Sequence, residues 1–144
     1  MTKMHERYKK DRVAKKLNSI IKKFKNGIVI VEGKHDIETL NKLGIKAITF
    51  NHFVSISRKN AEIKSDVTFY IFMDLDKGGY DKRDKTIDII ITQSNAKYNT
   101  ILGRRFLQFL NVTSVEQIYQ QYLHLTNQED ISYKYYNKHD KKPQ

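Results

Sequence analysis

The feature that most constrains this chain is the run at residues 28–36, which reads IVIVEGKHD. Its first four residues are β-branched and aliphatic, and a glycine lies on either side of the run 28–32. A short apolar run of this kind predicts a strand buried on both faces, as in a parallel sheet. The strand ends at Glu32, Gly33 and Lys34, and open parallel sheets bind their ligands at this carboxyl edge. The sequence therefore predicts an acid, a glycine and a lysine at a ligand-binding edge.

A second apolar run, at residues 67–73, ends in the same way at Asp74 and Asp76. In extended backbone, residues two apart point to one side, so we expect both aspartates to share a direction. They can meet Glu32 only if the first and third predicted strands are neighbours. The second predicted strand, at 45–50, must then lie outside the first, which creates the switch in winding direction where a crevice opens.

The remaining elements alternate with these strands and predict an α/β fold with a mainly parallel sheet of about four strands flanked by helices. Helices are predicted at 4–25, 35–43, 81–93, 104–110 and 114–125, a weak polar helix at 58–65, and a last strand at 98–102. Residues 51–57 and 74–80 are predicted to be loops near the strand ends. We divide the chain into a basic N-terminal helix (1–25), one α/β domain (26–125) and a polar tail (126–144).

Composition narrows the class of protein. The 144 residues include no cysteine, which excludes disulfides and thiolate metal sites and predicts a cytoplasmic location. No apolar run approaches the roughly 20 residues of a membrane-spanning helix, so no membrane partner is expected. The net charge is +11, and residues 1–27 hold ten Lys or Arg against two acids.

This basic segment predicts a polyanionic partner, RNA or DNA. In the helix at 4–25, Lys15, Lys16, Lys22 and Lys23 lie mostly away from the apolar stripe and are candidate phosphate contacts. The alternative interpretation is an ordinary packing helix with a lysine-rich solvated face.

The acids themselves indicate a metal. Three oxygen donors without cysteine suit Mg²⁺ or Mn²⁺, held by a few carboxylates, waters and substrate phosphates. Gly78 and Gly79 would let the backbone approach a phosphate, and Lys34 stands where a helix start favours an anion. Arg104 and Arg105 are candidate contacts to a nucleic-acid backbone. Taken separately, each motif is more often structural, since an aspartate after a strand commonly caps a helix or forms a turn.

Together, V-E-G-K-x-D at 31–36 and D-x-D-x-x-G at 74–79 resemble the Toprim domain of topoisomerases, bacterial primases and the ribonuclease that matures 5S ribosomal RNA. In size the chain is similar to the small stand-alone Toprim proteins of archaea. The resemblance implies a compact Rossmann-like fold. It implies that Glu32 is an acid/base or metal ligand, that Asp74 and Asp76 bind Mg²⁺, and that Lys34 contacts phosphate.

The resemblance also limits the activity. The chain has neither the tyrosine-bearing domain of topoisomerases nor the zinc and helical modules of primases, so it is expected to be neither by itself. Three alternatives remain: a metal-dependent nuclease or strand-transfer enzyme in RNA processing or DNA repair, a non-catalytic nucleic-acid-binding subunit or adaptor whose protein partner supplies specificity, and a nucleotide-binding regulator.

Overall fold

Two apolar runs of the sequence form the centre of the sheet. The computed structural model describes residues 3–59, 63 and 66–126. The strands are β1 (Ile28–Val31), β2 (Ala47–Thr49), β3 (Thr68–Ile71) and β4 (Lys97–Asn99). All pairings are parallel, and the order across the sheet is β2-β1-β3-β4. The predicted α/β class is confirmed, and so is the position of the second strand outside the first.

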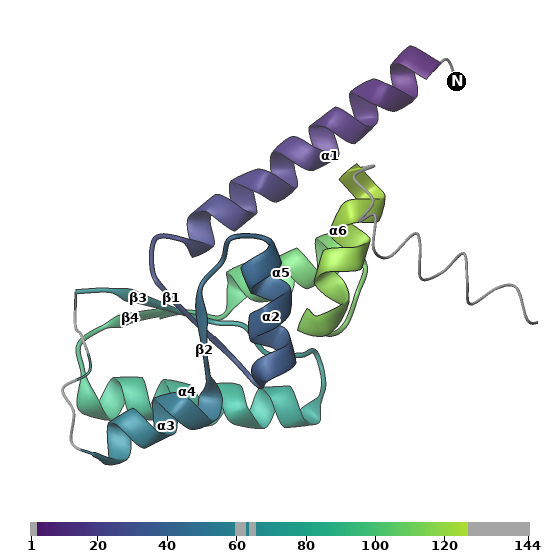
Figure 1. Cartoon of the computed structure of the whole chain (residues 1–144). Coiled ribbons are helices and arrows are strands. Elements are labelled where there is room, and N and C mark those ends of the chain that lie inside the picture. The colour runs from purple at the N-terminus through teal and green to yellow at the C-terminus, as the bar shows by residue number, and fades with distance from the viewer. Residues whose placement is uncertain (1–2, 60–62, 64–65, 127–144) are drawn as a thin grey trace, which may run out of the picture.

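Helices cover both faces of this sheet (Figure 1). They are α1 (Lys3–Phe24), α2 (Lys34–Lys42), α3 (Phe50–Arg58), α4 (Lys77–Gln93), α5 (Ile101–Leu110), a 3₁₀ turn η1 (Val115–Gln117) and α6 (Ile118–Thr126). The residues of α3 and α4 pack on one face, and those of α1, α2, α5 and α6 on the other. In the described part of the chain, no helix is long and apolar enough to cross a membrane.

Successive side chains of β1 point to opposite faces of the sheet, so each face has its own hydrophobic core. Val29 and Val31 are buried on the face that α1 and α5 cover, whereas Ile30 is buried on the face of α3 and α4. The ring of Phe24, at the end of α1, stacks on that of Phe72 with 5.1 Å between centroids. The basic helix therefore contributes to the main hydrophobic core, since Leu17, Ile21 and Phe24 are buried there. The lysines of α1 from Lys9 onward stay exposed.

One predicted loop is wrong. Residues 51–57 lie within α3, which begins directly after β2, where Thr49 Oγ1 accepts a hydrogen bond from the His52 N–H (3.1 Å). The signal for this helix is the three-and-four spacing of Phe50, Phe53 and Ser57, the last two of which are buried. The weak helix predicted at 58–65 is absent from the described part of that range, which holds the last residue of α3 and a turn.

Two other elements begin earlier than predicted. Helix α4 begins at Lys77 rather than 81, so the predicted loop at 74–80 is largely a helical turn. Strand β4 ends at Asn99, and the side chain of Asn99 accepts from the N–H groups of Ile101 and Leu102 (2.9 Å each), which starts α5. The tail, from residue 127 onward, lies outside the described residues.

Candidate functional site

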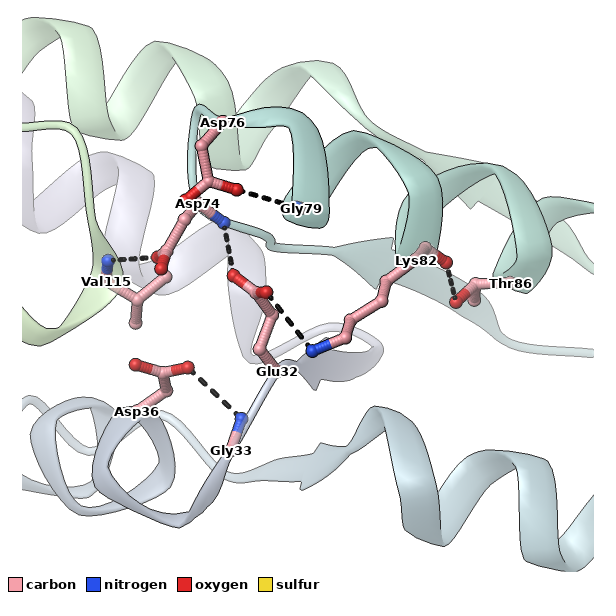
Figure 2. A network of polar contacts seen from close by, with 9 residues as sticks. All are labelled: Glu32, Gly33, Asp36, Asp74, Asp76, Gly79, Lys82, Thr86 and Val115. Atoms are coloured by element: carbon pink, nitrogen blue, oxygen red, sulfur yellow. Dashed lines mark hydrogen bonds and ion pairs between the residues drawn. The ribbon is translucent and has the colours of Figure 1, made fainter.

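Two acids from neighbouring strands meet at the carboxyl edge of the sheet. Glu32 follows β1, and Asp74 lies three residues past β3, whose ladder is extended by a hydrogen bond from Phe72 N to Ile30 O (2.9 Å). The Asp74 N–H donates to Glu32 Oε2 at 3.0 Å (Figure 2). The adjacency of β1 and β3 therefore places two acids 42 positions apart in direct contact.

The Asp74 carboxylate is hydrogen-bonded to the start of the 3₁₀ turn η1. Its Oδ1 accepts a hydrogen bond from the Val115 N–H at the start of η1 (2.9 Å). Burial raises the pKa of Asp74 to about 6. The Val115 N–H lowers this pKa, and the nearby Glu32 and Asp36 raise it. The fold therefore disfavours the ionised form of Asp74, and a bound cation would favour it.

A third acid, Asp36, completes the cluster. Its side chain is buried in the first turn of α2, and Oδ2 accepts from the Gly33 N–H at 3.2 Å. Burial is the largest cause that raises the pKa of Asp36; the Gly33 N–H lowers it, and the charge of Glu32 raises it. Figure 2 shows Glu32, Asp36 and Asp74 directed toward a shared space. Asp36 belongs to the E-G-K-x-D motif but was not among the residues predicted to form the site.

Asp76 has a different environment. It is exposed and caps α4, where its Oδ1 accepts from the Gly79 N–H at 2.7 Å. Because Asp74 is bonded to η1 and Asp76 to α4, the two aspartates do not share the direction that extended backbone would give them. Among the described residues, no three His, Asp or Glu side chains are grouped closely enough to hold a metal.

Lys82 is the functional candidate that sequence reasoning missed. Its Nζ lies 3.4 Å from Glu32 Oε1, and the side chain of Glu32 is only 16% exposed. The signal that could have found it is the start of α4. With Asp76 as the cap, positions 79, 82 and 86 fall on one side of the helix, so Lys82 lies on the same side as Gly79, which packs against Asp74. The ammonium thus balances one oxygen of Glu32 while the Asp74 N–H holds the other.

The other predicted residues are spread over the molecule. Lys34 is the exposed first residue of α2, directly after the motif glycine. Gly79 is buried in α4, where a Cβ would overlap the Asp74 backbone, so it serves close packing rather than a phosphate loop. Gly78 is exposed beside it.

The remaining predicted arginines and lysines lie on two helices, α5 and α1. Arg104 and Arg105 are exposed on α5, and Arg104 lines a small hollow together with Asp74, Tyr80 and Arg83. Lys15, Lys16, Lys22 and Lys23 are exposed on α1. Since α1 leads into the amino end of β1, its last turn lies at the edge of the sheet opposite the acids, and these lysines are not brought to them.

Comparison with known proteins shows the fold alone. No family model matches the chain, and no curated protein matches it. A solved structure, described as a putative protein from Aquifex aeolicus, is 23% identical, with a TM-score of 0.52, and the match covers 75% of this chain and 96% of that chain.

The acids fit a hard divalent cation. Mg²⁺ commonly uses only one or two carboxylates and completes its shell with waters and substrate phosphates. Glu32 and Asp74 supply such a pair, and burial first and the neighbouring acids second raise the pKa values of Asp74 and Asp36 beside them. Asp76 would have to give up its cap of α4 to join them.

Proposed function

We propose that this protein carries out Mg²⁺- or Mn²⁺-dependent phosphodiester chemistry on nucleic acid, as a nuclease or strand-transfer enzyme. The observation that carries the proposal is the contact between Glu32 and Asp74, which unites the two Toprim-like motifs at one sheet edge. Glu32 and Asp74 would hold the metal, with Asp76 as a further ligand. The bound metal would polarise a phosphoryl oxygen and neutralise developing charge.

The chain's own residues would then position the substrate. Lys82 keeps Glu32 in place and supplies a cation next to the acids. Lys34 and Arg104 are exposed at the same edge, from α2 and α5, and can contact phosphates on either side of the acids. Glu32 has one oxygen bound to a backbone N–H and the other to an ammonium, so it is oriented for acid/base or ligand work.

The second candidate is a binding subunit without catalysis. It is favoured by Asp76, whose carboxylate is engaged as a helix cap. In that case the acidic cluster would be a structural or regulatory metal site, and a protein partner would provide the chemistry.

The test uses variants that keep the structural hydrogen bonds. Labelled structured RNA and single- and double-stranded DNA are incubated with Mg²⁺ or Mn²⁺ beside Glu32→Gln, Asp74→Asn and Asp76→Asn. Asparagine can still accept from Val115 or cap α4, so a loss of activity then reports the lost charge. We expect Glu32→Gln and Asp74→Asn to reduce cleavage at least about a hundredfold.

The matched control is Asp88→Asn, an exposed acid on α4 about 18 Å along the helix from the cap. It should cleave like the wild type. If no substrate is cleaved with either metal, or if Asp74→Asn cleaves normally, the enzymatic proposal fails and the binding subunit remains.

A further inference from the structure

We infer that the groove between α1, α2 and α6 binds single-stranded nucleic acid, with phosphates on its lysines and a base on Tyr119. The groove has a volume of about 610 Å³, and its lining includes Lys22, Lys25 and Lys42 but no acid among the described residues. The inference rests on the proposed function in one respect: the bound strand would be the substrate of the acidic edge. Binding itself requires no metal.

The groove combines the two features that single strands need. Lys42 Nζ lies 5.0 Å from the centroid of the Tyr119 ring. A base that stacks on this ring would displace the ammonium, which is then free to pair with the adjacent phosphate. Paired bases in a duplex do not offer their faces to a side chain, so an aromatic ring among lysines favours unpaired strands.

The groove is also built to keep its shape. Ile21 and Leu123 are buried in its floor. At its side, the Tyr122 hydroxyl donates to Asn18 Oδ1 (2.8 Å), which ties α6 to α1. The apolar floor suits the flat face of a base, while the lysines stand at its margins.

The geometry of α1 divides the four predicted phosphate-contacting lysines into two pairs. Lys15 and Lys22 are seven residues apart, so they lie along one side of the helix, the side that also holds Asn18 and faces the groove. Lys16 and Lys23 lie along another side, where Lys16 Nζ is 5.0 Å from the ring of Phe109 on α5. The inference therefore assigns strand binding to Lys22 and not to Lys16 or Lys23.

Helix α2 reaches from the acidic cluster to the groove. Its first turn holds Asp36, and its last residue is Lys42. Nine residues of α-helix span about 14 Å, which is about four nucleotides of a stacked strand. A strand in the groove can thus extend along α2 and bring a phosphodiester bond near Glu32.

The test measures binding without metal. Fluorescence anisotropy is recorded with labelled 12-nucleotide single-stranded RNA, single-stranded DNA and the corresponding duplexes, in EDTA over a range of KCl concentrations. The groove variant is Lys22→Gln/Lys42→Gln, and the matched control is Lys16→Gln/Lys23→Gln. Each pair removes two charges, one from the last turn of α1 and one from above an aromatic ring.

We expect single strands to bind at least about tenfold more tightly than duplexes. The groove variant should weaken single-strand binding about tenfold or more and reduce the slope of log K against log salt by about 1.4, whereas the control should stay within about twofold of the wild type. Tyr119→Leu should weaken binding about tenfold with the slope unchanged, and Tyr119→Phe should bind like the wild type. The RNA and DNA arms identify the natural strand.

Equal losses in the two lysine pairs would overturn the inference in favour of diffuse charge, and tighter duplex binding would overturn it in favour of a helical partner. Binding that depends on the groove without metal-dependent cleavage would refute only the proposed function. Cleavage that is lost in Asp74→Asn but unchanged in the groove variant would refute only the groove.

Discussion

The two ends of α2 have opposite chemistry. At its amino end, Asp36 joins Glu32 and Asp74, and each of these acids is held by a hydrogen bond to backbone. At its carboxyl end, lysines and tyrosines line an open groove in which one side-chain hydrogen bond joins α1 to α6. The difference shows that the acidic edge is preorganised by backbone geometry, while the groove presents long, exposed lysine side chains that can adapt to a partner of variable shape.

The largest effect on this comparison is expected from Gly79→Ala. The new Cβ would overlap the Asp74 backbone, so the free energy of unfolding should fall by about 1–3 kcal/mol, and the acidic edge should be displaced. Gly78→Ala, next to it, would bring a Cβ only to ordinary contact with Asp76 Oδ1 (3.5 Å) and should change stability by less than about 1 kcal/mol. Urea denaturation measures both. Because the groove lies at the other end of α2, single-strand binding by the Gly79 variant should persist under native conditions.

A somewhat smaller effect is expected from Asp74→Asn in metal-free buffer. The folded pKa of Asp74, about 6, exceeds its unfolded value, so the fold favours the protonated form, and stability from this group is present below about pH 4 and lost as pH rises through 6. The variant should therefore be more stable than the wild type at pH 8, by about 1–2 kcal/mol, and the difference should shrink toward pH 4.

Thermal denaturation from pH 4 to 8 measures this difference. Mg²⁺ should raise the wild-type melting temperature at pH 8 and leave that of the variant unchanged. A variant that is less stable at pH 8, or that responds to Mg²⁺ as the wild type does, would show that the Asp74 carboxylate is structural. Single-strand binding in EDTA should be the same in both proteins.

Lys82→Met should have a more modest effect. The ammonium of Lys82 competes with a metal for Glu32 Oε1, so its removal should lower the half-saturating Mg²⁺ concentration about two- to fivefold, as expected for a partly exposed ion pair. Lys85→Met, an exposed lysine one turn further along α4, is the control. Titration calorimetry with Mg²⁺ measures both, and an unchanged or weaker affinity in Lys82→Met would argue that Lys82 supports metal binding instead.

The smallest effect is expected at the groove. Tyr122→Phe removes the solvent-exposed hydrogen bond to Asn18 but retains the ring, and this should cost no more than about 0.5 kcal/mol of stability. Metal affinity at the acidic edge should not change. If Tyr122→Phe altered the Mg²⁺ titration, the two ends of α2 would be coupled and would not act independently.

Much of the fold was predictable from a few residues. The apolar runs before Glu32 and Asp74 predicted two buried strands, and the requirement that these acids meet predicted that β1 and β3 are neighbours with β2 outside β1. Helix α3 was not predicted, because polar residues between Phe50, Phe53 and Ser57 make their three-and-four spacing hard to recognise. The start of α4 was missed because paired glycines suggest a loop, whereas close packing against Asp74 is what requires Gly79.

The sequence by itself determined that the two central strands are buried and that Glu32, Asp74 and Asp76 follow their ends, because hydrophobic runs and their boundaries are local properties. Only the tertiary structure decided which side chains face one another. It placed Asp36 and Lys82 beside Glu32, gave Asp76 to the cap of α4, and assembled the groove from α1, α2 and α6. These contacts join residues distant in sequence, and their directions depend on helix starts and packing that no single stretch of the chain specifies.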